Sequence, residues 1–561
     1  AITTGKRRGP GSVGLVAQSG NMVLTSMASS RGLALAHAVS VGNQAVVDAV
    51  DVMRFYLAEP RIRVIAAVIE SLSDIAKFRQ VAAQAAEQDV AMVVLKLGRS
   101  DKASRAAIAH TGSLTGSDQL YDALFKQYGV IRVDDLEELL ETAKLLSADR
   151  RPAGCRLAVF ASSGGECGLM ADLAAASRVE LPDLAPDCRE KLLDLLPPFA
   201  NPLNPLDITA SGWGSRDIYG GVARLLAESS DIDIVACVGD STRNSGQLAS
   251  TGWDKMIDGL VDAAEETDKP IAVINTLADV SYEMVDALAG RGIIHLSGAR
   301  TAMRAIGHAG SFAARRRGHP KLPVVTAIDD DRRSEALSRL PSVGSGGVDE
   351  STSKAILRLY GIPVPDGNRA TSLDGALRIA HEIGYPVALK IEAESIHHKT
   401  EVGGVELGIA SDDQLRHAFS DLSERVKAIA RDSRIHGILV ERMASGNVEL
   451  IVGGRNDPAF GPIVIAGLGG VMAEALEDAS TRLAPVDTVE AEAMLNELRG
   501  KKVLSSFRGR PAIDRAAFID VIVRVSQMLA ELPEIQELDL NPVIAGAVSE
   551  RVTAVDALIV V

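Results

Sequence analysis

Short, wholly apolar runs alternate with amphipathic stretches at the start of the chain. The runs at Val13–Ala17, Val64–Glu70 and Ala91–Lys96 have the pattern of strands buried on both faces. Between them, Asp74–Gln88 has the spacing of a crossover helix. This rhythm predicts a doubly wound parallel sheet with helices on both faces, ending where Arg and Pro break the pattern at residues 150–152.

A second α/β unit follows, with its own set of apolar runs and a basic, turn-rich segment at its end. We therefore predict one α/β domain over residues 1–150 and another over 151–325. Its predicted strands are Leu157–Ala161, Ile232–Val238, Ile271–Asn275 and Ile293–Leu296.

The pattern changes again beyond a predicted linker at residues 326–347, which ends in a Gly- and Ser-rich run. In residues 348–561 a predicted helix at Ser351–Tyr360 precedes strands such as Val387–Ile391 and Ile438–Arg442. Hairpin-like pairs replace the βαβ rhythm, so this third region is predicted to be an α+β domain.

Composition adds limits on function. A chain of 561 residues has room for several cores, because single cores rarely exceed about 300 residues. The net charge of −15 argues against a sequence-independent nucleic-acid binder. No apolar run reaches the roughly 20 residues of a membrane span, and no signal peptide is evident, so we expect no membrane partner. The four cysteines form no CxxC pair, which favours a reducing, cytoplasmic location.

Two strands lead directly into small, polar turns. Ser19 and Gly20 follow the first strand, and Ser163, Gly164 and Gly165 follow the first strand of the second unit. Each turn opens a predicted helix, whose free backbone N–H groups attract an anion. Either turn alone is more often simple packing than a phosphate site.

His110 lies in a loop of small residues, flanked by Gly112 and Gly116. A lone loop histidine is usually unremarkable in function, but a neutral imidazole is also a good nucleophile toward phosphorus. Two helix N-termini would stabilise the dianionic phosphohistidine. Glu70, at a strand end where such sheets place functional groups, is a candidate to orient His110 or simply a solvent-facing residue.

The last third offers residues suited to a nucleotide. Lys390 ends an apolar run and suits nucleotide phosphates, and residues 439–443 form a candidate strand and hinge around adenine. Asp539 and Asn541 are two apart on one side of a predicted strand, and Asp556 follows in what we expect to be the next strand. Such hard oxygen ligands suit Mg²⁺.

Five motifs, in their order along the chain, resemble the ADP-forming acetyl-CoA synthetase family, which is related to succinyl-CoA synthetase. The resemblance covers residues 10 to 561 and implies two flavodoxin-like parallel-sheet domains followed by an α+β ATP-grasp domain. The motifs are AHTGSL around His110, SSGG at 162–165, NPLD at 204–207, HKTEVGGV at 398–405 and LDLNP at 538–542.

The resemblance implies an acid–thiol ligase that makes acyl-CoA from a carboxylic acid, CoA and ATP through an acyl phosphate and a phosphohistidine. It implies His110 as the carrier, Glu70 as its partner, and His398 as a second histidine that ferries phosphate from the nucleotide. The other roles it implies are phosphate binding by Ser19, Gly20, Ser163, Gly164 and Gly165, ATP binding by Lys390, Glu441 and Met443, Mg²⁺ binding by Asn541 and Asp556, and a place near the transfer for Asp539.

The sequence departs from the family at three points. The family's N-terminal CoA-binding domain does not precede residue 10, so we expect either a fragment or a separate CoA-binding subunit, and a homo-oligomer is a further alternative. Glu166 adds a negative charge to the second turn, and His397 adjoins His398. The acid is not readable, and acetate or another small acid is our expectation.

Two other functions fit parts of the sequence. A catalytically inactive, regulatory module of a protein acetyltransferase predicts an acetyltransferase domain or a lost histidine, and neither is visible. An ATP-grasp carboxylate–amine ligase accounts for residues 348–561 but leaves His110 without a role.

Overall fold

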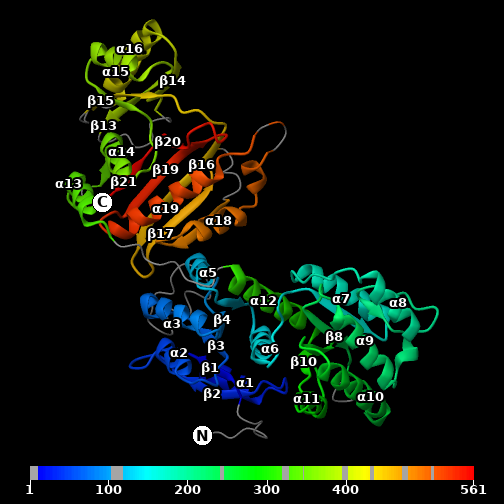
Figure 1. The fold of residues 1–561 in the computed structure, drawn as a ribbon. Helices are drawn as coiled ribbons and strands as arrows, with labels where there is room; N and C mark the ends of the chain where they lie inside the picture. Colours follow the sequence, from blue (N-terminus) through cyan, green and yellow to red (C-terminus); the bar gives the residue numbers. More distant parts are fainter. Residues whose placement is uncertain are drawn as a thin grey trace. The chain divides into compact units, whose positions relative to one another are not determined.

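The computed structural model describes residues 11–100, 102, 118–240, 246–318, 328–344, 346–393, 402–429, 435–470, 478–506, 509 and 511–561 (Figure 1). The chain forms two compact units, residues 1–322 and 323–561. The first unit contains two parallel sheets, and the second contains two antiparallel ones.

The first parallel sheet has the strand order β2-β1-β3-β4-β5. Two of its predicted strands are confirmed to the residue, and the third ends at Ile69, one residue before Glu70. The edge strands β2 and β5 were not predicted. The elements of this part are β1 Val13–Ala17, α1 Gly20–Ala28, β2 Leu35–Ser40, α2 Ala49–Leu57, β3 Val64–Ile69, α3 Ile75–Glu87, β4 Ala91–Lys96, α5 Asp118–Gln127, β5 Ile131–Val133 and α6 Leu136–Ser147.

The second parallel sheet has the order β10-β9-β8-β6-β7, which is the same topology as the first sheet counted from its own first strand. Both sheets therefore have the flavodoxin-like order, as the sequence predicts. Its elements are β6 Leu157–Ala161, α7 Gly164–Ala176, α8 Pro186–Leu195, β7 Leu206–Asp207, α9 Arg216–Glu228, β8 Ile234–Val238, α10 Gly246–Glu265, β9 Ile271–Asn275, α11 Tyr282–Ala289, β10 Ile294–Ser297 and α12 Ala299–Gly318.

Helices cover both faces of the first sheet. Val13 and Leu15 share a buried core with Leu139 of α6, whereas Gly14 faces the opposite side. There the Tyr56 ring of α2 lies so close that a Cβ on Gly14 would be 2.5 Å from it. Tyr56 also donates a hydrogen bond of 2.7 Å to the Leu15 carbonyl, which ties α2 to β1.

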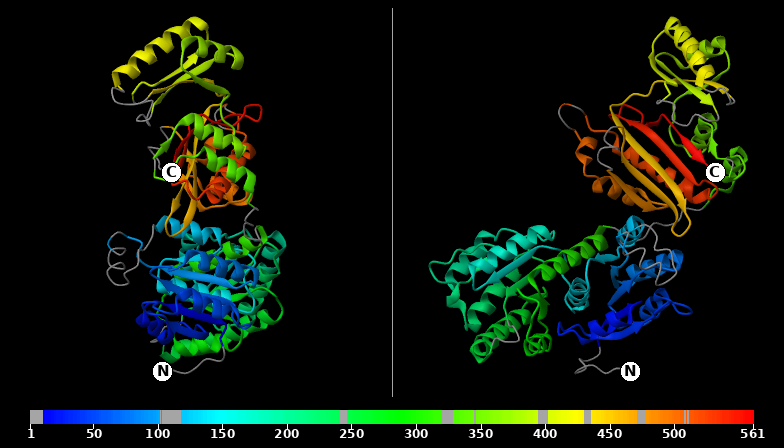
Figure 2. Two further views of the ribbon diagram at one scale, coloured as in Figure 1. Left: turned by 90° about the vertical axis from the view of Figure 1, so that its left-hand side faces the viewer. Right: turned by 180° about the vertical axis from the view of Figure 1, so that it is seen from behind.

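The long helix α12 joins the two parallel sheets into one unit. It packs against α6 of the first sheet and α7 of the second, and Figures 1 and 2 show it running beside both. Its apolar residues belong to a single core that spans both sheets. Members of this core from each part include Val64, Leu139, Leu157, Met170 and Met303.

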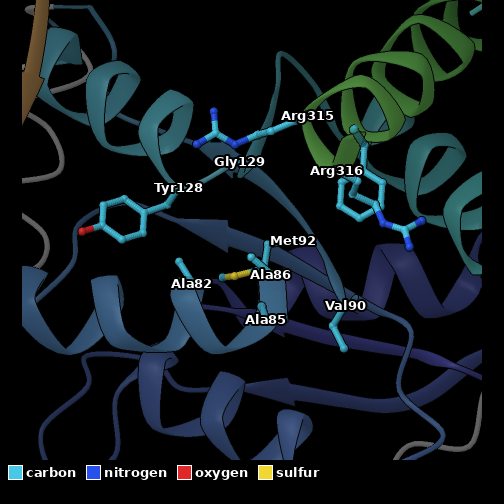
Figure 3. Close-up of a pocket in the computed structure, with 10 residues that line it drawn as sticks. Ala82, Ala85, Ala86, Val90, Met92, Tyr128, Gly129, Arg315 and Arg316 are labelled. Carbon is cyan, nitrogen blue, oxygen red and sulfur yellow. The ribbon is translucent and has the colours of Figure 1, made fainter. Parts of the chain in front are cut away.

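The end of α12 reaches a small crevice beside α3 (Figure 3). Arg315 extends over Gly129 and donates to the Gln127 carbonyl, and Arg316 pairs with Asp89 at 2.8 Å. The crevice measures about 50 Å³, which is room for a few solvent molecules. These contacts therefore serve to dock α12 on the first sheet.

The second unit is built around two antiparallel sheets. The larger has the order β11-β21-β19-β16-β17-β18, with β20 on β19, and the smaller has the order β12-β15-β13-β14. The strands are β11 Gly347–Val348, β12 Gly367–Ala370, β13 Val387–Ala393, β14 Val405–Ile409, β15 Ile435–Arg442, β16 Val448–Asp457, β17 Gly461–Leu468, β18 Ala479–Leu483, β19 Glu537–Ala545, β20 Thr553–Ala554 and β21 Leu558–Val560.

Helices pack on both of these sheets. Phe518 and Val525 of α19 enter the core of the larger sheet, and Leu415 of α16 enters the core of the smaller one. The helices of this unit are α13 Asp330–Arg339, α14 Glu350–Leu359, α15 Leu373–Ile383, α16 Asp412–Ile429, α18 Thr488–Glu497 and α19 Arg515–Glu531.

Among the described residues, no helix combines the length and the apolar character that crossing a membrane requires.

The packing of α12 on α7 predicts the effect of two helical glycine substitutions. A Cβ on Gly307 would lie 2.2 Å from the Ser177 carbonyl oxygen, so we expect Gly307→Ala to lower stability by about 1–3 kcal/mol. Gly168 in α7 has open space around its Cβ position, so Gly168→Ala should stabilise by about 0.4–1 kcal/mol. Urea unfolding followed by circular dichroism measures both, and equal shifts would contradict the close α12–α7 contact.

Candidate functional site

The first candidate site lies where the strand order of the first sheet reverses, between β1 and β3. Ligands of open parallel sheets bind outside the carboxyl ends of the strands at this switch point. Ser19 and Gly20 directly follow β1, and Glu70 directly follows β3, its parallel neighbour. The structure thus brings three of the predicted residues to one edge of one sheet.

Gln18 ties these two loops together. Its side chain is buried, with 7% of its surface exposed, and its carbonyl oxygen accepts from the backbone N–H groups of Glu70 and Ser71. Its amide nitrogen donates to the Ser71 carbonyl at 2.8 Å. Gln18 therefore fixes the start of the Glu70 loop relative to α1. Sequence analysis did not assign it a role, although an amide side chain directly after an apolar strand, in the turn before a helix, was the signal that was available.

Two helices of the first unit begin with a serine that does not cap them. Neither Ser19 before α1 nor Ser163 before α7 makes a side-chain capping bond. In contrast, the N-cap side chains of α2, α3, α6, α9 and α11 each accept from a backbone N–H of the first turn. The first-turn N–H groups of α1 and α7 are thus not occupied by their N-cap side chains, and those are the helices predicted to bind phosphate.

The turn before α7 lies at the switch point of the second sheet, between β6 and β8. Gly164 begins α7 beside Asp207 of β7, and a Cβ on Gly164 would lie 3.1 Å from the Asp207 carboxylate. Asn204 fixes this neighbourhood because its side chain pairs with β6 as a strand would. It accepts from the Val159 N–H at 3.1 Å and donates to the Leu157 carbonyl at 2.8 Å. The NPLD motif therefore positions Asp207 next to the start of α7.

Three carboxylates surround the start of α7. Burial, together with the charges of Asp240 and Asp207, raises the pKa of Glu166, which is in the first turn of the helix. Burial and the same kind of repulsion, from Asp207 and Glu166, raise the pKa of Cys167 to about 11. The electrostatic potential at the start of α7 is therefore more negative than at a helix N-terminus without carboxylates. It disfavours phosphate binding unless Glu166 is protonated.

Lys96 is a buried charge beside Glu70 that sequence analysis did not select. It is the last residue of β4, pairs in register with Ile69, and exposes 1% of its surface. Its ammonium lies 4.4 Å from the centre of the Tyr121 ring. Burial lowers the pKa of Lys96 to about 8, with Asp118 and Glu70 opposing that change and Arg132 adding to it. Its position after a fully apolar strand run was the available signal.

The two predicted carrier histidines, His110 and His398, lie outside the described residues. Their roles remain predictions, as does the orientation of His110 by Glu70.

In the second unit, Lys390 and Glu441 lie on neighbouring strands of the smaller sheet. The sequence placed Lys390 at a strand end, but β13 continues to Ala393, so the lysine lies within the strand. The strand continues because Ile391 enters the core while Glu392 accepts from Ser351 at 2.7 Å. Met443 follows β15, and its backbone N–H donates to the Pro386 carbonyl at 3.1 Å.

Lys390 is buried among acidic groups. Its ammonium lies 2.8 Å from Glu350 and 3.3 Å from Glu441. Burial opposes the charge, but Glu350, Glu441 and Asp556 outweigh it and raise the pKa of Lys390. The lysine is therefore a fixed positive charge at neutral pH.

The predicted Mg²⁺ ligands lie on and next to β19. Asp539 and Asn541 alternate with the buried Leu538 and Leu540, so they share the other face of the strand, as predicted. The expected strand around Asp556 is wrong, because β20 ends at Ala554 and β21 begins at Leu558. Asp556 lies in the connection between them, where its carboxylate accepts from the Ala557 N–H at 3.0 Å.

Comparison with known protein families identifies two segments of the chain. Residues 10–146 match the model of the succinyl-CoA ligase-like flavodoxin domain, and residues 341–561 match an ATP-grasp domain. Among individual proteins, trans-feruloyl-CoA synthase FCS1 of an unknown prokaryotic organism is 34% identical, over 99% of this chain and 77% of its own length. Acetate–CoA ligase [ADP-forming] I of Archaeoglobus fulgidus is 33% identical, over 95% of this chain and 76% of its own. The 4-hydroxybutyrate–CoA ligase [ADP-forming] of Nitrosopumilus maritimus is 29% identical, over 95% and 76%.

The matched flavodoxin and ATP-grasp domains, together with relatives that are CoA ligases over most of the chain, identify an acid–thiol ligase. The chain belongs to the family of ADP-forming acyl-CoA synthetases, for which ATP or ADP and CoA are substrates. The carboxylate–amine ligase alternative is therefore wrong. All three relatives carry the names of CoA ligases or synthases, so they lend no support to the regulatory-module alternative.

The acidic surroundings of α7 predict the effect of removing one charge. Replacing Glu166 by Gln removes a negative charge from the first turn, so we expect the KM for phosphate in the ADP-forming enzyme's reverse reaction to fall about three- to tenfold. The raised pKa means that wild-type Glu166 becomes neutral as pH falls, so the difference between the two proteins should shrink toward acidic pH. Steady-state kinetics with acyl-CoA, ADP and phosphate tests this, and a difference that is independent of pH would contradict it.

Proposed function

We propose that the protein makes acyl-CoA reversibly from a carboxylic acid, CoA and ATP, through an acyl phosphate and a phosphohistidine at His110. The observation that carries this proposal is the pair of helices, α1 and α7, that begin at sheet switch points without a side-chain cap. A dianionic phosphoryl group needs such donors while it is in transit. Family membership supports the reaction, and the fixed carboxylate loop at Glu70 supports the site.

In this proposal His398 receives the phosphoryl group near the nucleotide and His110 delivers it to the acyl site. A mobile carrier lets one ATP site serve a separate acyl site. Lys390 would contact the nucleotide phosphates, Glu441 and Met443 the adenine region, and Asp539 would lie near the transfer. Ser19, Gly20, Ser163, Gly164 and Gly165 would hold the phosphoryl group at the other end of its path.

Mg²⁺ fits the residues of the second unit. Within the described residues no cluster of three or more His, Cys, Asp or Glu side chains could hold a metal without other ligands. Mg²⁺ bound with a nucleotide does not require one, because it takes one or two protein oxygens together with phosphates and waters. Asn541 and Asp556 supply such oxygens. When bound, the ion would neutralise part of the phosphate charge.

The acid is proposed to be acetate or another small acid. The related proteins are named for acetate, 4-hydroxybutyrate and ferulate, so the family includes both small and aromatic acids. We also propose that the protein is cytoplasmic. We further propose that it assembles as a homo-oligomer or with a CoA-binding subunit.

The phosphoryl relay predicts a specific pattern of labelling. Incubation with [γ-³²P]ATP and Mg²⁺ should label the protein with acid-labile, base-stable phosphate, as phosphohistidine chemistry requires. His398→Ala should lose the label, whereas His110→Ala should keep label on His398 alone and lose acid-dependent acyl-CoA formation by more than about 1,000-fold. His397→Ala is the matched control and should keep both. Labelling that survives the loss of His398 would contradict the two-histidine relay.

The choice of acid predicts a ranking of substrates. ADP release in the presence of CoA, measured with acetate, 4-hydroxybutyrate and ferulate, should give the highest kcat/KM with acetate. Each methylene or ring that the pocket cannot accommodate should cost roughly tenfold or more. A higher kcat/KM with ferulate would overturn the small-acid proposal while leaving the relay intact.

A further inference from the structure

A ring of four charged side chains lies inside the second unit. The Lys354 ammonium is 2.6 Å from Glu350 and 2.5 Å from Glu441, and the Lys390 ammonium is 2.8 Å and 3.3 Å from the same two carboxylates. Each of the four residues exposes 6% or less of its surface. Both lysines also donate to the Val555 carbonyl, Lys354 at 2.8 Å. The charges alternate around the ring and sum to zero.

The ring connects three parts of the fold. Glu350 and Lys354 are one turn apart on α14, and that spacing places them on the same side of the helix. Lys390 and Glu441 come from β13 and β15 of the smaller sheet, and the Val555 carbonyl comes from the connection between β20 and β21 of the larger one. Glu350 and Lys354 are close in sequence, whereas the other three pairs of opposite charges join residues that are far apart along the chain.

The balance of charge matters because the ring is shielded from water. A buried carboxylate without a counter-ion is strongly unfavourable, whereas a paired one is tolerated. If Lys390 turns toward nucleotide phosphates, Glu350 and Glu441 must keep another cation. Lys354 bridges both carboxylates and is the only other cation of the ring, so it meets this requirement without moving.

The two lysines also influence each other. Burial and the neighbouring charge of Lys390 lower the pKa of Lys354, against the attraction of Glu441 and Glu350. Movement of the Lys390 charge away from the ring would remove that repulsion and strengthen the hold of Lys354 on its proton. The ring is therefore arranged so that one lysine can leave while the other stays charged.

We propose that Lys354 is a positioning residue of the nucleotide site, which pairs with both Glu350 and Glu441 and so frees the Lys390 ammonium to bind nucleotide phosphates. This inference rests on the proposed role of Lys390. Without Lys354, Lys390 would be the one cation left in this ring of four, facing two buried carboxylates, and would be held back from the nucleotide. Removing one carboxylate as well would leave one uncompensated negative charge when Lys390 departs, the same as in wild type, and would release Lys390 again.

Nucleotide binding to the full chain tests this directly. Isothermal titration with the Mg²⁺ complex of a non-hydrolysable ATP analogue should give a dissociation constant raised about tenfold or more in Lys354→Met. In Glu350→Gln/Lys354→Met it should return to within about threefold of wild type. The KM values for CoA and the acid should stay unchanged in both variants, which separates this role from a general loss of structure.

A control variant in the first unit shows what the loss of a buried ion pair does by itself. Lys144 lies 2.8 Å from the fully buried Glu141 in the first unit, so Lys144→Met should lower stability without changing nucleotide affinity. If Lys354→Met does not fold, the double variant carries the test. A folded double variant with affinity far below wild type would overturn the inference, and so would a folded Lys354→Met that binds as wild type does.

Lys390→Met separates this inference from the proposed function on which it rests. It should weaken binding of the analogue at least as much as Lys354→Met does. Unchanged affinity in Lys390→Met would refute the role of Lys390 in the nucleotide site itself. Weakened affinity in Lys390→Met together with wild-type affinity in Lys354→Met would refute only the role of Lys354.

Discussion

The parallel pairing of β1 with β3, and of β6 with β8, is the constraint on which the first unit depends. At each of these pairs the order of strands reverses, so the loops that follow two adjacent strands diverge and leave room for a ligand. Side chains then lock each switch point. Gln18 binds the loop after β3, and Asn204 pairs with the backbone of β6. The hydrogen bonds that fix the starts of α1 and α7 therefore come from the side chains of Gln18 and Asn204. They do not involve the backbone N–H groups in the first turn of either helix.

Charges with little access to water are the second common feature, and their partners decide their state. Burial and the neighbouring carboxylates of Asp240 and Asp207 raise the pKa of Glu166. Lys96 is buried against the Tyr121 ring, and burial lowers its pKa, so it loses its proton more easily than an exposed lysine does. Lys390 has two carboxylates within 3.3 Å and keeps its charge. Burial thus shifts some pKa values toward neutral pH and leaves other groups charged. Opposite charges compensate for lost hydration, whereas like charges add to the cost of losing it.

Local patterns in the sequence predicted the buried centre of the fold well. β1, β4, β6 and β9 have the predicted bounds because their runs are apolar, apart from a final Lys96 or Asn275, and end at polar turns. The edge strand β2 escaped notice because its residues are half-buried and include His37, and β7 escaped because it spans only two residues. β8 begins two residues late because Ile232 is buried outside the strand, and burial does not distinguish a strand from the loop that leads into it.

The sequence by itself determined the order of the domains, the motifs that identify the family and the kinds of side chain available for phosphoryl transfer. Hydrophobic periodicity and turn residues act over a few positions, so they can be recognised without knowing the fold. Only the tertiary structure decided which of these groups meet. Gln18 and Ser71 are 53 residues apart, and Lys354 and Glu441 are 87 apart. Such partners are chosen by strand order and helix packing, which bring together distant residues that no local pattern connects.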